Sequence, residues 1–328
     1  MTKRLKSLIA LLLVFILTFS MVACSKEKEQ EAKEDSQSVT QTESDSSEVA
    51  QDQEETSTQE IETSQRVEEL LSSLTLEEKV GQMIQPAVYN VSTSDMEEYG
   101  YGSILSYTSY MDQSELGWKN TVLTWQKAAL NSSSGIPYLF GNDAVHGVNV
   151  STDSVIFPHN IGIGAANNPE LTYKMGEAVA NELKLTGMIW NFSPCLAVAS
   201  EPRWGRTYES YSSDPEIVKT LGEAYSKGQL DNGIIVTAKH FIGDGSIGYG
   251  TGEDDFLIDR GDATLNDEQL EALLDIYRTQ IAAGVQTIMI SHSSLNGTKM
   301  HANKELITDV LKGELRFKGF VVSDWESI

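Results

Sequence analysis

The chain has 328 residues, 40% of them apolar, which suits a globular protein of one large domain or two ordinary ones. It carries 24 basic and 48 acidic residues, for a formal net charge of -24, so phosphates would be repelled and we exclude nucleic acid as a partner. Two cysteines, Cys24 and Cys195, are present. Because Cys24 ends an export signal, a disulfide framework is excluded, and we interpret Cys195 as a small buried apolar residue.

Residues 1–23 have the pattern of a bacterial lipoprotein signal peptide. A basic stretch at positions 3–6 precedes the apolar run Leu8–Phe19, and Met21-Val22-Ala23-Cys24 follows. The last four residues resemble a lipobox, with Met21 where Leu is usual. By that resemblance Cys24 would be lipidated and would hold the chain, outside the cytoplasm, on the cell membrane. An ordinary signal peptide or a plain membrane anchor is the alternative.

Residues 24–65 are rich in Glu, Ser, Gln, Thr, Asp and Lys and nearly free of apolar side chains. Such a segment cannot bury enough surface to offset the entropy lost on ordering. We expect a disordered acidic tether here, followed by a folded domain over residues 66–328.

Within residues 66–328, short apolar runs alternate with segments of helical periodicity. The expected strands are Gly81–Val88, Gly102–Tyr107, Pro137–Gly141, Met188–Ser193, Ile234–Phe241, Gln286–Ser291 and Gly319–Ser323. The expected helices are Leu116–Leu130, Pro169–Leu185, Pro215–Leu230, Asn266–Ala283 and Asn303–Leu311. This alternation predicts an α/β fold, a TIM-type (β/α)8 barrel that is incomplete with about seven strands. A doubly wound open sheet is the alternative. No Gly-rich nucleotide-binding motif follows a strand, so we expect no cofactor.

Polar residues lie at the end of five of the expected strands or just after it. They are Asn142 to His146, Glu201 to Arg206, Lys239 with His240 and Asp244, His292, and Asp324 with Trp325. In a barrel these strand ends meet at one rim, which is where such enzymes place their active sites. Carboxylates accept hydrogen bonds from sugar hydroxyls, Arg and Lys donate them, and a carboxylate can attack an anomeric carbon. Sugar chemistry is therefore our first interpretation.

A metal site is the competing interpretation. His146, His240 and His292 together with Asp143 have donor atoms that suit zinc. No HxH or HExxH spacing occurs among them, and the histidines follow different strands. We therefore expect no metal.

Several long motifs occur in one order along the chain. They are Leu74 to Met83, Asp143-Ala144-Val145-His146-Gly147, Phe157-Pro158, Asn191 to Leu196, Pro202 to Tyr211, Ala238 to Gly245, and Val321 to Trp325. With them the chain resembles, from about Ser73 to Ile328, the N-terminal barrel of glycoside hydrolase family 3. That family contains β-glucosidases and exo-β-glucanases.

The resemblance implies a role for each matching residue. Asp324 would be the nucleophile, and Trp325 would shape the subsite beside it. Four residues would bind hydroxyls of the sugar in subsite -1: Asp143, Arg206, Lys239 and His240. A salt bridge across the rim is the alternative role for Arg206 and Lys239, and Glu209 would support Arg206. Trp204 would either stack on the sugar or pack in the interior.

Two departures from the family pattern stand out. His292 occupies the position where many relatives have a tyrosine, so we expect it to substitute in substrate binding. The chain ends at Ile328, before an eighth strand and before the second domain that carries the acid/base Glu in two-domain relatives. We therefore expect a barrel truncated after its nucleophile motif, with the acid/base in a missing C-terminal domain.

The resemblance implies retaining hydrolysis of terminal β-D-glucosyl residues from β-glucosides or β-glucan oligosaccharides. A sugar-binding lipoprotein without catalysis is one alternative. A β-xylosidase or a β-N-acetylglucosaminidase of the same family is another. The latter branch uses an Asp-His pair on a loop after Lys-His-Phe-Pro-Gly, whereas this chain has Ile242 and no such pair.

Overall fold

The structure is a computed structural model, and it describes residues 65–328. The predicted signal peptide, Cys24 and all but the last residue of the predicted tether lie outside the described residues. A helix over residues 65–73 precedes the first element of the domain. None of the helices in the described part of the chain combines the length and the apolar character that a membrane span needs.

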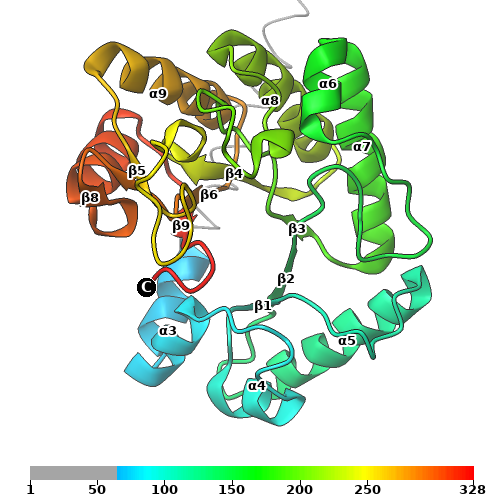
Figure 1. Cartoon of the computed structure of the whole chain (residues 1–328). Coiled ribbons are helices and arrows are strands. Elements are labelled where there is room, and N and C mark those ends of the chain that lie inside the picture. Colours follow the sequence, from blue (N-terminus) through cyan, green and yellow to red (C-terminus); the bar gives the residue numbers. More distant parts are fainter. Residues whose placement is uncertain (1–64) are drawn as a thin grey trace, which may run out of the picture. The chain divides into compact units, whose positions relative to one another are not determined.

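A parallel sheet of six strands forms the centre of the domain (Figure 1). Its spatial order equals its chain order: β1 (Ser103–Leu105), β2 (Leu139–Asn142), β3 (Trp190–Asn191), β4 (Ile235–Phe241), β6 (Thr287–Ile290) and β9 (Phe320–Val322). All five neighbouring pairs are parallel. Parallel neighbours in chain order, joined by crossover helices, form the curled wall of a barrel. The predicted α/β fold and incomplete TIM-type barrel are therefore confirmed.

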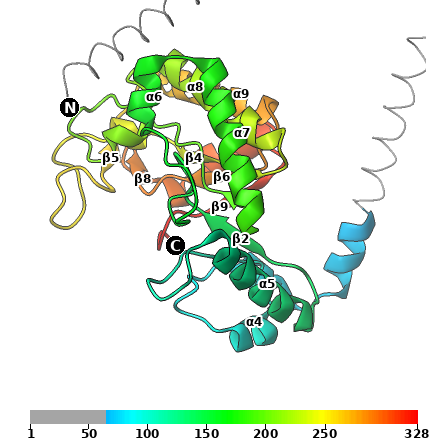
Figure 2. The same ribbon diagram turned by 90° about the vertical axis from the view of Figure 1, so that its right-hand side faces the viewer.

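Helices cover the outside of this sheet, as Figures 1 and 2 show from two directions. They are α4 (Thr93–Tyr99), α5 (Glu115–Asn131), α6 (Asn160–Ala166), α7 (Pro169–Thr186), α8 (Pro215–Leu230), α9 (Asp267–Ala282) and the π-helix η4 (Glu305–Glu314). Helices α7 and α8 begin as the sequence predicts, because Asn168 and Asp214 cap helices whose first residue is proline. The segment predicted as an α-helix at Asn303–Leu311 is instead η4, which starts two residues later.

The strand predicted at Gly81–Val88 is wrong. Its first three residues complete helix α3 (Leu76–Met83), which a capping box between Thr75 and Glu78 starts. Of the remaining residues, only Ala87 pairs with the sheet, through an isolated bridge to Leu105. The main sheet consequently has six strands and not seven.

A small second sheet lies beside the carboxyl end of β6. It contains β5 (Asp262–Ala263), β7 (Ser294–Leu295) and β8 (Thr298–Lys299), followed by the 3-10 turn η3 (Met300–Ala302). β5 and β7 are parallel, whereas β7 and β8 form a hairpin. This sheet fixes the path of the chain after β6, and so it fixes the position of His292 and of the residues that follow it.

The apolar core has two parts. The larger part lies between the sheet and the outer helices, and Trp118, Leu183, Leu221 and Ile288 are fully or almost fully buried there. The smaller part fills the inside of the barrel with Trp190, Phe192 and Met289. Trp190 donates from Nε1 to Thr237 Oγ1 at 2.9 Å, which satisfies its one polar side-chain atom. The inner part forms the floor beneath the rim described next.

Candidate active site

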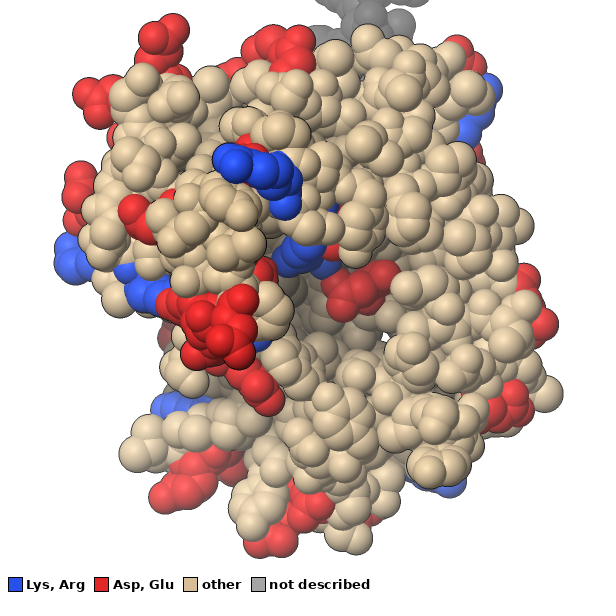
Figure 3. Space-filling model, viewed as in Figure 1, with Lys and Arg blue, Asp and Glu red and all other residues tan. Residues whose placement is uncertain are grey.

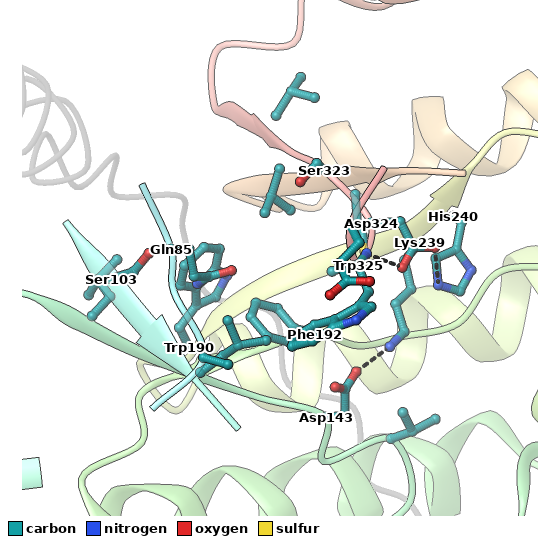
Figure 4. A pocket seen from close by; sticks show the side chains of 18 of the residues that line it. Gln85, Ser103, Asp143, Trp190, Phe192, Lys239, His240, Ser323, Asp324 and Trp325 are labelled. Carbon is teal, nitrogen blue, oxygen red and sulfur yellow. Dashed lines mark hydrogen bonds and ion pairs between the residues drawn. The ribbon is translucent and has the colours of Figure 1, made fainter. Parts of the chain in front are cut away.

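A cavity of about 1170 Å³ opens at the carboxyl ends of the strands. Figure 3 shows it as a hollow at the centre of this face, with acidic and basic atoms on its wall. Its floor includes Trp190 and Phe192 from the barrel interior, and charged side chains from the ends of β2, β4 and β9 form its rim (Figure 4). A cavity that combines aromatic side chains on its floor with charged and polar groups on its wall is suited to a small ligand with an apolar face and polar groups around its edge.

Six of the seven residues predicted to act at the site line this cavity. They are Asp143, Arg206, Lys239, His240, Asp324 and Trp325. His292 is not among the lining residues, and the centroid of its ring lies 6.4 Å from that of His301. Trp204 is buried and does not line the cavity either, so it packs in the interior. The predicted lipidation site, Cys24, is outside the described residues.

Asp324 follows β9 and places its carboxylate in the cavity. Its Oδ1 accepts the backbone N–H of Trp325 at 2.7 Å, and its Oδ2 lies 3.8 Å from His240 Nε2. Burial by itself would raise the pKa of Asp324, but His240, the Trp325 N–H, Arg206 and Lys239 outweigh it and lower that pKa below its ordinary value. The carboxylate is therefore ionised, as a nucleophile must be.

Lys239 and Asp143 form an ion pair across the cavity, with Nζ 2.5 Å from Oδ1 (Figure 4). Lys239 is only 4% exposed, whereas the Asp143 side chain is 58% exposed and faces the opening. Burial would lower the pKa of Lys239, but the Asp143 charge outweighs it and the pKa is raised. The pair thus presents a fixed ammonium and a carboxylate with one free oxygen to a ligand.

The loop that carries Asp143 is held by a buried asparagine. Asn191, on β3, accepts the Ala144 N–H through Oδ1 at 2.9 Å and donates from Nδ2 to the Ala144 oxygen at 3.1 Å. The same Nδ2 also lies within hydrogen-bond distance of Gln229 Oε1 and Ser193 Oγ, so its two hydrogens are shared among three acceptors. A fully bonded buried amide of this kind fixes the loop, because moving it would leave buried polar groups unpaired.

Arg206 reaches the cavity from the loop after β3 and is held by Glu209. Two parallel hydrogen bonds of 2.8 Å join Arg206 Nε and Nη2 to the two carboxylate oxygens. Burial would raise the pKa of Glu209, but the Arg206 hydrogen bonds and charge, with Lys239 and His240, lower it to about 2. The expected support of Arg206 by Glu209 is therefore a direct contact. Arg206 Nη2 also lies 3.4 Å from His240 Nε2, which joins this pair to the Asp324 side of the cavity.

His240 is oriented from behind by Asp244, whose Oδ2 lies 2.7 Å from Nδ1. Cys195 lies close to both, so three potential metal donors are grouped among the described residues. Burial, with the charge of Asp244, raises the pKa of the Cys195 thiol to about 12, which disfavours the thiolate that a metal would need. Asp244 is already engaged with the imidazole. We therefore interpret the group as the support that orients His240.

The sequence placed His146 at the rim, but it did not point to His159, Tyr208 or His301. His146, His159 and Tyr208 line one side of the cavity as a chain of aromatic contacts, with ring centroids 4.2 Å and 4.9 Å apart. His301 contacts the backbone of Asp324 from η3. Nothing in the spacing of these residues predicts the contacts, since each depends on how a loop folds back after its strand.

The chain is similar to known proteins over most of the described residues. The model of the glycosyl hydrolase family 3 N terminal domain matches residues 75–328. The lysosomal beta glucosidase of Dictyostelium discoideum is 28% identical over 295 residues, which are 80% of this chain and 35% of the relative. A beta-xylosidase of Formosa agariphila is 34% identical over 214 residues, which are 61% of this chain and 29% of the relative.

Two solved structures have the same fold. The exo-1,3/1,4-beta-glucanase of a Pseudoalteromonas species aligns with a TM-score of 0.74 at 38% identity, over 80% of this chain and 34% of that one. The beta-glucosidase of Listeria innocua in complex with glucose aligns with a TM-score of 0.69 at 27% identity, over 80% and 37%. The chain thus spans about a third of the length of these relatives. On the match of residues 75–328, the chain belongs to glycosyl hydrolase family 3, within the family's N-terminal domain.

Proposed function

We propose that the protein is a retaining glycosidase that removes terminal non-reducing β-D-glucosyl residues from β-glucosides or β-glucan oligosaccharides. The observation that carries the proposal is the ionised Asp324 carboxylate inside a cavity whose wall holds Lys239, Arg206 and His240. A single carboxylate surrounded by donors to hydroxyl groups suits attack on an anomeric carbon. The relatives named beta glucosidase, beta-glucosidase and exo-glucanase support glucose as the sugar.

In the first step Asp324 Oδ attacks C1 of the bound sugar. The bond from C1 to the leaving oxygen breaks, and an acid gives that oxygen a proton. In the second step water attacks C1 of the glycosyl ester, loses a proton to the same acid/base and frees the carboxylate. Asp143, Lys239, Arg206 and His240 bind the hydroxyls, and Trp325 forms the wall beside the nucleophile.

Two carboxylates of the cavity wall, Glu209 and Asp143, are paired with basic side chains, and neither is suited to act as the acid/base. Glu209, whose pKa is about 2, is ionised and cannot donate a proton at neutral pH. Asp143 is engaged with Lys239. The relatives are about three times as long as the matched region, and we propose that the acid/base is supplied by a part corresponding to their remaining length.

A β-xylosidase is the second candidate, because the Formosa agariphila relative is 34% identical. A sugar-binding lipoprotein without catalysis is the third, because the export pattern suits a transporter's binding protein equally. Initial rates with aryl β-glucoside and aryl β-xyloside separate the first two. In a protein that also carries the part supplying the acid/base, binding of glucose without turnover of either aryl glycoside would support the third.

Covalent trapping tests the nucleophile. A 2-deoxy-2-fluoro-β-glucosyl reagent with an activated leaving group needs no acid, so it reports on Asp324 alone. We expect peptide mass spectrometry to locate the label on Asp324, and Asp324→Asn to abolish labelling. Asp309→Asn, which changes an exposed carboxylate on η4, is the matched control and should label like the wild type. A label on any other residue would overturn the assignment.

We also propose that Cys24 is lipidated and holds the domain outside the cytoplasm on the cell membrane. The lipobox-like Met21-Val22-Ala23-Cys24 supports this location. In a bacterial host, Cys24→Ala should move the protein out of the membrane fraction, whereas Cys195→Ala should leave it there. Equal fractionation of wild type and Cys24→Ala would contradict the proposal.

A further inference from the structure

A histidine lies directly behind the backbone of Asp324. His301 belongs to η3, which follows the small sheet, and its Nε2 accepts the Asp324 backbone N–H at 3.2 Å. A backbone N–H can only donate, so Nε2 must carry its lone pair in this contact. The imidazole is therefore neutral, with its proton on Nδ1.

The contact matters because few other bonds fix this part of the chain. Asp324 follows β9, which is the last strand of the main sheet among the described residues. The Asp324 side chain is tied to the next residue, Trp325, and the Asp324 carbonyl oxygen accepts the Ser327 N–H at the long distance of 3.4 Å. Both of these partners lie within the same short segment. Among the hydrogen bonds of the described residues, the His301 contact is the one that ties this segment to another element, and it acts beside the 3.8 Å ion pair between the Asp324 carboxylate and His240.

The surroundings of His301 favour its neutral form. The charged and titratable groups that face it are His292 from the loop after β6, Lys299 from β8, and the Asp324 carboxylate. Burial, followed by repulsion from His292 and Lys299, lowers the pKa of His301, and these effects outweigh the opposite effect of Asp324. The imidazole therefore stays an acceptor at neutral pH and becomes a donor only at acid pH.

We propose that His301 is a positioning residue for the nucleophile: its neutral imidazole holds the Asp324 backbone, and protonation of the imidazole releases it. A protonated Nε2 carries a hydrogen that meets the backbone N–H, so the two donors repel and the segment that carries Asp324 moves. The inference rests on the proposed role of Asp324 in glycosyl transfer. The proposal also gives a role to His292, which helps to lower the pKa of His301.

Three substitutions separate the hydrogen bond from packing. Gln places its terminal oxygen near the position of Nε2, so His301→Gln keeps an acceptor that does not titrate. His301→Leu keeps much of the volume without an acceptor, and His301→Asn is too short to reach. A displaced nucleophile reacts slowly, so we expect about 10-fold to 100-fold slower covalent labelling by the fluoroglucosyl reagent in the Leu and Asn variants. His301→Gln should label within about threefold of the wild type.

The pH profile of labelling distinguishes positioning from a purely structural role. In the wild type the labelling rate should fall as the pH drops through the pKa of His301. In His301→Gln this limb should disappear, and the rate should fall only when Asp324 itself is protonated at lower pH. Identical acid limbs in the two proteins would overturn the proposal, and so would unchanged labelling rates in both the Leu and the Asn variant.

A measurement that needs no reaction decides the proposal separately. In ¹⁵N-labelled intact protein, the Asp324 amide resonance should shift with the same midpoint as the His301 imidazole, and His301→Gln should abolish that shift. His159→Gln, which changes a histidine on another side of the cavity, should leave it in place. An Asp324 amide that ignores the titration of His301 would refute the inference. If the amide follows His301 while the wild type takes no label, the proposed function fails and the positioning contact stands.

Discussion

The Arg206–Glu209 pair offers the sharpest test of the site, through the variant Glu209→Gln. The two carboxylate oxygens of Glu209 accept parallel hydrogen bonds of 2.8 Å from Arg206. The Glu209 side chain is 14% exposed and that of Arg206 is 35% exposed. The amide cannot accept both bonds, so the variant leaves a largely buried guanidinium without its counter-charge.

The size of the loss follows from the pKa of the carboxyl. A fall from the ordinary value of 4.5 to about 2 corresponds to about 3 kcal/mol of interaction in favour of the ionised form. Because Arg206 stays about a third exposed, solvent screening reduces this to about 2 kcal/mol. Breaking a fully buried pair costs about 3–5 kcal/mol, which sets an upper bound. We therefore expect Glu209→Gln to lower the free energy of unfolding at pH 7 by about 2–3 kcal/mol.

Urea unfolding of wild type and variant at several pH values is the assay. The pKa of Glu209 is depressed in the folded state, so its stabilisation is fully present above pH 4.5 and is lost as the pH falls toward 2. The difference between the two proteins should therefore shrink across that range. Glu201→Gln is the control, since Glu201 makes a similar bidentate pair with the well-exposed Arg203 and should matter much less. Equal stability of wild type and Glu209→Gln at pH 7 would refute the reasoning.

Three further substitutions have defined outcomes. Lys239→Met removes the buried ammonium from the cavity wall. Steady-state kinetics with an aryl β-glucoside should show kcat/KM lowered about 100-fold or more, and a thermal melt should show that the fold is retained. Asn191→Leu leaves two backbone groups of the loop after β2 unpaired and should cost about 2–4 kcal/mol in urea unfolding; a loss below about 1 kcal/mol would contradict the anchoring role. Gly164→Ala would place Cβ 1.6 Å from the Tyr211 oxygen and should destabilise the protein by about 3 kcal/mol, whereas Gly205→Ala, with no atom within 4 Å, should be almost neutral in the same assay.

Local signals in the sequence predict most of the outer helices well. Helix α8 has the predicted bounds, and α5, α7 and α9 differ from theirs by one residue at one or both ends. Capping residues and helical periodicity act within a turn or two of the chain, so they can be recognised without tertiary context. The wrong strand at Gly81–Val88 reflects a local signal of the same kind that the prediction did not use. Its apolar run suits either element, and the capping box just upstream extends the helix into it.

The candidate site was predictable to the extent that it depends on strand ends. Asp143 and Asp324 follow β2 and β9, Lys239 lies near the end of β4, and parallel strands bring their ends to one rim. Loops do not obey this rule. His292 follows β6 directly, yet β7 and β8 turn the chain so that His301 contacts the Asp324 backbone instead.

Periodicity, capping and order along the chain were enough to predict the alternation of strands and helices and the incomplete barrel. The family resemblance of the motifs then pointed to seven site residues, six of which line the cavity. The support of Arg206 by Glu209 was already expected from the family resemblance, whereas Asp244 as the partner of His240 and His301 as the partner of the Asp324 backbone emerge only from the folded chain. Ion pairs and hydrogen bonds form over about 3 Å between groups that loops bring together, and the composition of a loop does not specify its path to that precision.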